Sequence, residues 1–392
     1  MDITDNHNGN NFAVDSEVEC GNVATAKGIR VMITALRRFL ALLGATLTLT
    51  LAACSGAPEE GDGARSEFNI GWSIYAGWMP WPYADQAGIV DKWEEKYGVT
   101  INFVQVNDYV ESVNQYTAGQ LDGVTVANMD ALTIPAAGGK DTSAIIVGDY
   151  SNGNDGILLK NTPDLAAIEG RQVNLVELSV SHYLLARALE TSGLAMTDVR
   201  TVNTSDADIA GAFTSEDVTA AVAWNPQLTA MREVPGANLV FSSADIPGEI
   251  VDVLVVDTAT LKANPALGKA LAGIWYETMA LMSADTEEAK TARAAMAKLA
   301  GTTPDVFEAQ LATTYLYSDP AGAVAATSDP ALIETMKKVR DFSFSQGLFG
   351  QGARSADAVG MAFPGGEVLG DADNVTLRFD ATYMQMAADD EV

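Results

Sequence analysis

From Phe68 onward, short apolar segments alternate with segments of helical periodicity, and no other feature limits the possible folds of this chain as strongly. The segment VTINFVQV, residues 99–106, is typical of a buried strand. Asp108 follows it and stands three residues before Glu111, a spacing that predicts a helix N-terminus. Strands that alternate with helices form parallel sheets covered by helices on both faces. The sequence therefore predicts the α/β class.

The last third of the chain has a different pattern. Residues 258–350 are rich in Ala, Leu, Met, Glu and Lys at helical spacing. This composition predicts a helical cap on the first part of the α/β fold. In the tail, residues 375–384 are expected to add one more strand.

The charge and the small number of reactive side chains exclude several functions. The chain has 52 Asp and Glu against 23 Lys and Arg, so a nucleic acid partner is not expected. Its two histidines, His7 and His182, and its two cysteines, Cys20 and Cys54, do not have the spacing of a zinc site. No glycine motif for a phosphate follows a strand. We therefore expect no metal, no cofactor and no catalytic residue.

The N-terminus reads as an export signal. Arg37 and Arg38 precede an apolar run, residues 39–54, that is too short to span a bilayer and ends in small residues. Its last four residues, LAAC, resemble a bacterial lipobox, which implies a lipid on Cys54. We expect the following division: 1–31 a non-native or disordered extension, 32–53 the signal peptide, and 54–67 a flexible tether. The mature protein would then lie in the periplasm or on the cell surface, held to the membrane by the lipid.

Aromatic and acidic side chains gather where the predicted strands end. The stretch GWSIYAGWMPWPY, residues 71–83, contains three tryptophans and no charge. In α/β sheets ligands bind at the carboxyl ends of strands. Those ends carry aromatic rings, amides and carboxylates and almost no Lys or Arg, whereas an anion site needs cationic or backbone donors. The residues expected to bind a ligand are Ser73, Tyr75, Trp78, Asn128, Asp130, Asp155, Glu177, Ser179, Trp224, Asn225 and Glu249.

Several of these positions also have a purely structural interpretation. Asp130 and Ser179 can cap the helices that follow them. Glu249 lies near an expected crossover between lobes, where a hinge ion pair competes with ligand binding. Tyr75 and Trp78 can equally be core residues. The sequence leaves these alternatives open.

Longer segments resemble a known family. The runs GRQVNLVELSVSHYLLARALETSGL (170–194), DVRTVNTSDADIAGAF (198–213) and AAVAWNPQL (220–228) resemble the nitrate/sulfonate/taurine class of periplasmic substrate-binding proteins. GWSIYAGWMPW, NDYVESVNQYTAGQ and NMDALTIPAAGG resemble a branch found with urea-carboxylase-type genes, which is linked to urea or guanidine. The resemblance implies a two-lobed periplasmic binding protein fold of type II with a C-terminal helical region. Its expected parts are lobe 1 at 68–150, lobe 2 at 151–250, and a return to lobe 1 at 251–392.

The resemblance also implies a function and partners. The expected role is the extracytoplasmic solute-binding component of an ABC importer, working with a permease and its ATPase. Urea and guanidinium are small, flat and rich in N–H donors, so aromatic walls and acceptors suit them. Buried carboxylates favour guanidinium, whereas the amides Asn128 and Asn225 alone favour urea. Alternatives are a sulfonate or an amidine as ligand, a pyrimidine-precursor synthase on the same fold, and a lipoprotein that senses a ligand without transport.

The anchor can be tested directly. Because Cys54 ends the lipobox-like segment, we expect the wild-type protein to partition with membranes and the Cys54→Ala variant to be released or mislocalised. Detergent phase partitioning with mass spectrometry of the mature N-terminus measures both. A fully soluble wild-type protein with an unmodified Cys54 would contradict the lipid anchor.

Overall fold

A computed structural model describes residues 65–392 of the chain. The expected extension, signal peptide and lipidated Cys54 lie outside the described residues, as does most of the expected tether. Glu67, the last residue of the expected tether, pairs with Thr100 in the first strand. No helix in residues 65–392 is long and apolar enough to cross a bilayer.

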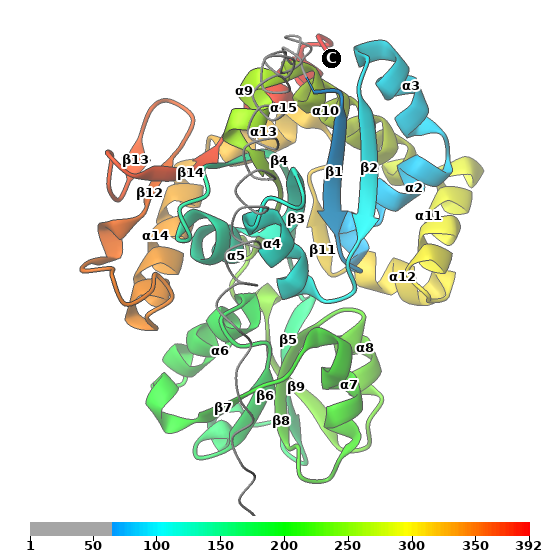
Figure 1. Ribbon diagram of the computed structural model, residues 1–392. Helices are drawn as coiled ribbons and strands as arrows, with labels where there is room; N and C mark the ends of the chain where they lie inside the picture. Colours follow the sequence, from blue (N-terminus) through cyan, green and yellow to red (C-terminus); the bar gives the residue numbers. More distant parts are fainter. Residues whose placement is uncertain (1–64) are drawn as a thin grey trace, which may run out of the picture. The chain divides into compact units, whose positions relative to one another are not determined.

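The fold is α/β with two sheets, as predicted (Figure 1). The larger sheet has nine strands in the order β13-β12-β14-β4-β10-β3-β1-β2, with β11 paired to β4, and forms the first lobe. Its strands are β1 (Glu67–Trp72), β2 (Thr100–Gln105), β3 (Gly123–Ala127), β4 (Thr142–Ser151), β10 (Val251–Asp257), β11 (Thr314–Leu316), β12 (Gly360–Ala362), β13 (Val368–Leu369) and β14 (Val375–Phe379).

The smaller sheet has five strands in the order β7-β6-β8-β5-β9 and forms the second lobe. Its strands are β5 (Asp155–Lys160), β6 (Gln172–Leu175), β7 (Arg200–Asn203), β8 (Ala220–Trp224) and β9 (Ala237–Ser242). The chain therefore passes between the sheets twice, from β4 to β5 and from β9 back to β10. The side chains at these two crossovers are brought together although about a hundred residues of chain separate them.

The prediction of wholly parallel sheets was wrong. Strands β1, β2 and β3 are parallel, but β10 runs antiparallel to both β3 and β4. In the same way β5 runs antiparallel to β8 and β9. Strands β10 and β5 enter their sheets from the other lobe, and neither is preceded by the helical crossover that makes neighbouring strands parallel. Two further pairs, β11 with β4 and β12 with β13, are also antiparallel.

Helices cover both sheets. The helices of the first lobe are α2 (Pro80–Gln86), α3 (Ile89–Tyr97), α4 (Tyr109–Thr117), α5 (Asn128–Ala131), α9 (Thr258–Ala263), α10 (Pro265–Ser283), α11 (Glu287–Leu299), α12 (Pro304–Leu311), α13 (Pro320–Thr327), α14 (Pro330–Ser345) and α15 (Thr382–Ala388). Those of the second lobe are α6 (Val180–Thr191), α7 (Asp206–Thr214) and α8 (Gln227–Arg232). Short turns complete the fold: η1 (Ala76–Trp78), η2 (Leu132–Ala136), η3 (Leu165–Ile168), η4 (Met196–Asp198), η5 (Ser243–Asp245) and η6 (Ala356–Ala358).

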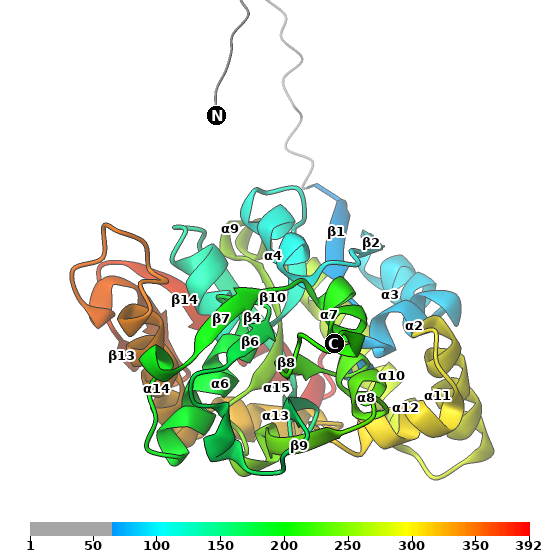
Figure 2. The ribbon, with the colours of Figure 1, turned by 90° about the horizontal axis from the view of Figure 1, so that it is seen from below.

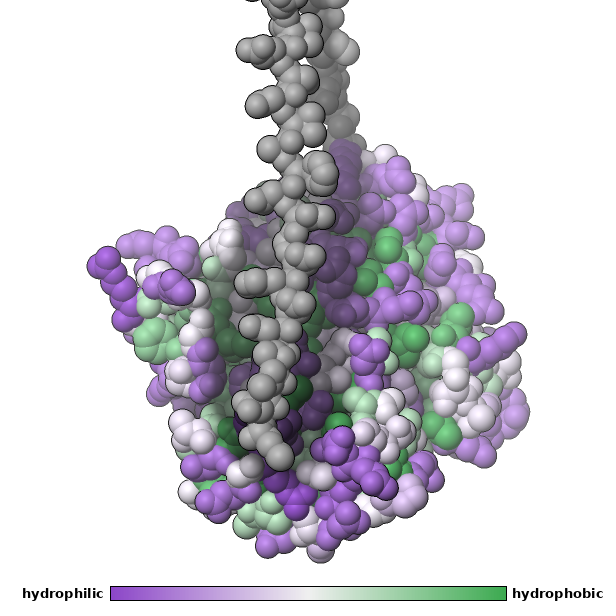
Figure 3. Space-filling view, turned by 60° about the horizontal axis from the view of Figure 1, so that its bottom comes forward, coloured by the Kyte–Doolittle hydropathy of each residue, from purple (hydrophilic) through white to green (hydrophobic). Residues whose placement is uncertain are grey.

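The helical C-terminal region is confirmed, since α9 to α14 fill most of residues 258–345. Helix α14 with β12 and β13 lies on one flank of the first lobe, and α11 and α12 lie on the opposite flank (Figures 1 and 2). The helical segment between Pro80 and Tyr97 is divided into α2 and α3. Gly88 breaks it, because its φ of 73° is left-handed and cannot continue a helix. The face shown in Figure 3 is mostly polar, with small apolar areas.

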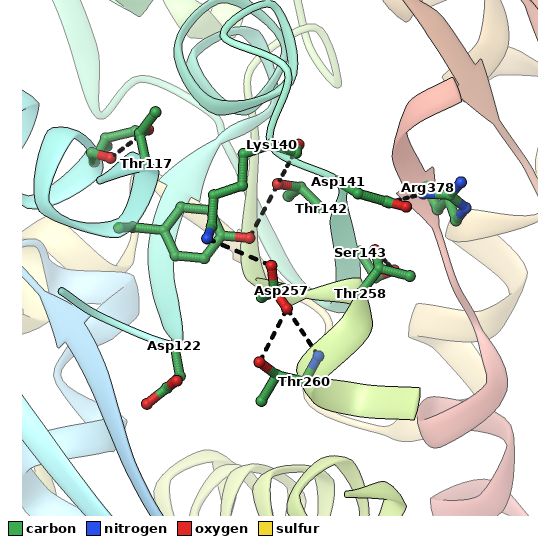
Figure 4. A network of polar contacts seen from close by, with 12 residues as sticks. Thr117, Asp122, Lys140, Asp141, Thr142, Ser143, Asp257, Thr258, Thr260 and Arg378 are labelled. Atoms are coloured by element: carbon green, nitrogen blue, oxygen red, sulfur yellow. Dashed lines mark hydrogen bonds and ion pairs between the residues drawn. The ribbon is translucent and has the colours of Figure 1, made fainter. Parts of the chain in front are cut away.

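A polar network fixes the end of β4 that lies away from the crossover (Figure 4). Asp257 accepts the Thr260 backbone N–H at 2.8 Å and so caps α9, and it also pairs with Lys140 at 3.4 Å. Arg378 of β14 pairs with Asp141. The Tyr116 hydroxyl bonds Thr142 at 3.0 Å. These contacts hold β14, α9 and α4 around the start of β4 and so anchor the strand whose other end reaches the second lobe.

Helix α10 is the central packing element of the first lobe. Its Trp275 packs 4.8 Å from Trp81 between ring centroids, and Phe103 lies 5.2 Å from the other side of Trp81. Trp72 and Trp81 are both buried in the core. Gly273 of α10 lies against Trp93, whose indole N–H donates to Glu277 at 2.7 Å. This hydrogen bond holds the Trp93 ring over Gly273, which has no side chain.

This contact gives a stability prediction. A Cβ at Gly273 would lie 2.4 Å from the Trp93 ring, so Gly273→Ala must displace a ring that is fixed by its hydrogen bond. We expect the free energy of unfolding to fall by about 1–3 kcal/mol. The matched control is Gly211→Ala in α7, where no atom lies within 4 Å; helix propensity should raise stability there by up to about 1 kcal/mol. Differential scanning calorimetry measures both, and equal effects would contradict the packing argument.

Candidate ligand-binding site

A small cavity lies between the two lobes, where the crossovers meet the strand ends. Its volume is about 30 Å³, counted as the space open to the centre of a water molecule. A single water needs roughly 10–15 Å³ on this measure, so the cavity admits a molecule of only a few non-hydrogen atoms. The first lobe contributes Tyr75, Trp78, Tyr109, Ala127 and Asp252, the second contributes Asn154, Asp155, Val180 and Trp224, and Ile250 lies on the crossover.

Four aromatic rings form most of the wall. Tyr75 and Trp78 meet edge to face with centroids 5.0 Å apart, in the turn after β1. Tyr109 begins α4 after β2 and lies 5.8 Å from Trp78. Trp224 ends β8 and meets Tyr109 edge to face at 5.5 Å, from the opposite lobe. The rings therefore close the cavity from both lobes.

Two carboxylates lie side by side at the first-lobe end. Asp149 of β4 and Asp252 of β10 are direct partners in the antiparallel register. The Tyr75 hydroxyl donates to Asp149 Oδ1 at 2.7 Å, whereas Asp149 Oδ2 has no donor among the described residues. Burial raises the pKa of Asp149 to about 7, and burial with the neighbouring Asp149 raises the pKa of Asp252 well above its ordinary value.

Two further acceptors come from the second lobe. Asp155 begins β5 and accepts the Ser151 hydroxyl at 2.5 Å, and burial raises its pKa to about 6. Asn154 is also buried, and its side-chain oxygen has no donor in the described part of the chain. No Lys, Arg or His lines the cavity. The site therefore offers acceptors and ring faces, which suit a cationic, N–H-rich molecule and oppose an anion.

Asp130 supports this wall from behind. Its Oδ2 accepts the Tyr109 hydroxyl at 2.6 Å, and the Val180 backbone N–H of the second lobe lies 3.4 Å from the same oxygen. The Tyr109 hydroxyl in turn accepts the Ala127 backbone N–H at 3.0 Å. Asp130 is fully buried, and burial raises its pKa to about 7. It holds Tyr109 in place without lining the cavity.

The structure brings only some of the sequence-predicted residues to the cavity. Tyr75, Trp78, Asp155 and Trp224 line it, and Asp130 is one hydrogen bond away. Ser73 is buried nearby but is not part of the lining.

The other predicted residues have structural contacts elsewhere. The Asn128 amide spans the crossover, since it donates to the Glu249 carbonyl at 3.1 Å and accepts the Val251 N–H at 3.3 Å. Asn225 accepts the Thr229 N–H at 3.0 Å. Ser179 caps α6 through the Ser181 N–H at 3.2 Å.

Glu249 and Glu177 also lie away from the cavity. Glu249 accepts the Tyr183 hydroxyl at 2.6 Å and pairs with Arg187 at 2.8 Å and Lys338 at 2.7 Å. This is the interlobe ion pair that the sequence left open as an alternative. Glu177 accepts the Thr201 hydroxyl and borders a separate surface groove beside Asp108 and Asp206.

Sequence reasoning missed several cavity residues. Tyr109 reads as the apolar start of a helix, and Asn154 stands in a polar loop. Asp252 lies inside the apolar strand segment VDVLVVD, and its neighbour Asp149, which does not itself line the cavity, lies in TSAIIVGDYS. A carboxylate within a buried strand is a signal in itself, because it must be paired, protonated or used. Only the register of β4 and β10 shows that these two carboxylates are neighbours.

Comparison with known proteins agrees with this architecture. A model of the NMT1-like family matches residues 71–301. The chain belongs to the NMT1-like family. No curated protein matches the sequence. The resemblance to the nitrate/sulfonate class is thus supported at the level of family and fold, whereas the association with urea-carboxylase genes stays a prediction.

Solved structures of similar fold include sulfonate- and nitrate-binding proteins. The alkanesulfonate-binding protein SsuA of Xanthomonas axonopodis pv. citri, bound to MOPS, has 18% identity and a TM-score of 0.61, covering 74% of this chain and 96% of its own. SsuA of Escherichia coli has 20% identity and a TM-score of 0.60, and the match covers 73% of this chain and 94% of SsuA. The nitrate-binding protein NrtA of Synechocystis PCC 6803 has 11% identity and a TM-score of 0.53, and the match covers 82% of this chain and 98% of NrtA. These likenesses establish the fold and leave the ligand to be argued from the cavity.

The buried Asp130 gives a pH prediction. Its folded-state pKa of about 7 lies above the ordinary 3.8, so the folded protein binds this proton more tightly than the unfolded chain. The bound proton therefore stabilises the folded protein fully below about pH 4, and this contribution is lost as the pH rises to about 7. Between pH 4 and pH 8, we expect the free energy of unfolding of the wild type to fall by about 2–4 kcal/mol more than that of Asp130→Asn.

Thermal unfolding is the appropriate measurement, because urea and guanidinium salts are candidate ligands. Asp217→Asn, at an exposed loop position, is the control and should follow the wild type at every pH. A parallel pH response of wild type and Asp130→Asn would show that Asp130 is not protonated in the folded protein.

Proposed function

We propose that this protein is the solute-binding component of an ABC importer and that its ligand is a small planar cation of the guanidinium class. The observation that carries the ligand class is the lining of the cavity: four aromatic rings, the carboxylates of Asp155 and Asp252, an Asn154 oxygen without a donor, and no cationic side chain. The family and the two-lobed fold support the importer role. The partners on this proposal are a permease and its ATPase, and the lipid at Cys54 would keep the protein beside them.

The size of the cavity supports a ligand without long substituents. A space of about 30 Å³ suits guanidinium, urea or an amidine and is too small for a bulky sulfonate such as MOPS. Because residues of both lobes form the wall, we expect the lobes to move apart as a ligand enters and to close around it. A thermodynamic consequence is that ligand binding favours the closed arrangement of the lobes.

The charge and shape of guanidinium match the two kinds of wall. Its flat faces can lie against Trp78 and Trp224, where a cation gains about 0.5–2 kcal/mol from a ring. Its in-plane N–H groups can reach Asp252, Asp155 and the Asn154 oxygen as charge-assisted hydrogen bonds. An anion would meet the same carboxylates without a compensating donor, which disfavours sulfonate and nitrate.

Urea is the second candidate because it has the same shape. Asn128 and Asn225, the amides that would have favoured urea, are engaged in crossover and loop contacts outside the cavity. A neutral ligand would leave ionised carboxylates buried and uncompensated, unless they are protonated. The carboxylate-rich lining therefore favours the cation. An enzymatic role gains no support from a lining without His, Cys, Ser or Lys.

Calorimetry with a ligand panel tests the proposal. We expect guanidinium to bind more tightly than urea and acetamidine, and taurine and nitrate to give no binding heat. Trp78→Ala should weaken guanidinium binding by about 1–3 kcal/mol through lost ring contact. Asp155→Asn should weaken it by about 2–5 kcal/mol, because a desolvated charge partner is removed. Asp257→Asn, in the network at the far end of β4, is the matched carboxylate control and should bind like wild type.

Two outcomes would overturn parts of the proposal. Tighter binding of taurine or nitrate than of guanidinium would refute the ligand class. If urea bound more tightly and Asp155→Asn had no effect, the ligand would be neutral and the aromatic walls alone would define the site.

A further inference from the structure

The most unusual feature beside the cavity is the pair formed by Asp252, which lines it, and Asp149, which lies behind Asp252 on the neighbouring strand. Two like-charged side chains directly opposite on antiparallel strands destabilise a sheet when both are ionised. Here both are buried, with exposed fractions of 0% and 7%. Neither has a hydrogen bond or ion pair to Lys, Arg or His in residues 65–392. The fold thus holds two acids together without a cation of its own.

The groups that face the pair do not supply that charge. From the turn after β1, Tyr75 donates its hydroxyl to Asp149 Oδ1 and lies 3.4 Å from the Thr314 hydroxyl of β11. Asp155 of β5, Tyr109 of α4 and Tyr317 after β11 are the other titratable groups near enough to influence the pair. Asp252 also borders a smaller cavity with Thr125 of β3 and Trp275 of α10. All of these neighbours are neutral or acidic.

The hydrogen bonds indicate where a proton must lie. Asp149 Oδ1 already accepts from Tyr75, so Asp149 Oδ2 is the oxygen that remains for Asp252. Gly77 leaves room for this oxygen, since a Cβ there would come within 2.4 Å of it. Two adjacent carboxylates in a site of low dielectric hold one proton between them, because both cannot ionise together. The raised pKa values of the pair agree with this arrangement.

We propose that Asp149 and Asp252 share one proton when no ligand is bound, and that a cationic ligand releases this proton to solvent as it enters. The inference rests on the proposed cationic ligand and adds a mechanism of selection. One positive charge enters and one leaves, so the charge of the cavity is unchanged. A neutral molecule such as urea cannot displace the proton and meets one carboxyl that is still protonated. The pair therefore distinguishes ligands by charge, whereas the aromatic walls distinguish them by shape.

Calorimetry in buffers of different ionisation enthalpy counts the protons released. At about pH 6 we expect wild type to release about one proton more than Asp149→Asn when guanidinium binds. Below about pH 6, the affinity of the wild type for guanidinium should fall with each pH unit about tenfold more steeply than the affinity of Asp149→Asn falls. Asp217→Asn removes an exposed carboxylate away from the cavity and should bind guanidinium and release protons as wild type does. Urea, where it binds, should exchange no proton.

A second measurement does not depend on affinity. Difference infrared spectroscopy should show loss of a protonated carboxyl C=O band when guanidinium binds to wild type, and no loss of this band in Asp149→Asn. Asp252→Asn provides a second variant in case the first does not fold, and thermal unfolding reports folding for each.

The outcomes separate this inference from the proposed function. Failure of wild type to bind guanidinium at any pH refutes the proposed function. Binding that releases no more protons from wild type than from Asp149→Asn and Asp252→Asn overturns the shared proton and leaves the proposed function standing.

Discussion

The antiparallel pairing of β4 with β10 is the contact on which the rest of this structure depends. These strands carry the chain out to the second lobe and back, so their register fixes how the two crossovers lie side by side. The polar network around Asp257 and Lys140 anchors one end of the pair. The other end holds Asp149 against Asp252 at the cavity. One ladder of backbone hydrogen bonds thus determines both the connection between the lobes and the acidity of the site.

Around this ladder the two lobes supply different parts of one small site. The first lobe provides Tyr75, Trp78 and Tyr109 from loops after parallel strands, and the second provides Asp155 and Trp224. Neither set forms a closed surface alone, which couples binding to the arrangement of the lobes. The fold is shared with sulfonate- and nitrate-binding proteins, and the cavity lining here is aromatic and acidic. A fold fixes where a ligand binds, whereas the side chains at the strand ends decide which charge it carries.

Much of the fold could be predicted because it depends on local pattern. Alternating strand and helix segments gave the α/β class, and the helical composition after Thr258 gave the C-terminal region. The Asp108 cap on α4 also followed from spacing alone, since its bond to the Glu111 N–H joins residues three apart. Tyr75, Trp78, Asp155 and Trp224 were found because strand ends are where α/β folds place ligands.

The sequence by itself determined the chemical character of this protein: acidic, aromatic at its strand ends, with few Lys and Arg to bind anions and few His and Cys. Only the tertiary structure decided which of those side chains meet. It places Asn128 and Glu249 at the crossover, where Asn128 donates to a backbone carbonyl and Glu249 forms an ion pair with Arg187. It also brought Asp252 to Asp149 across about a hundred residues of chain. The reason is physical: composition and spacing act locally, whereas strand register is fixed by packing and backbone hydrogen bonds between distant segments.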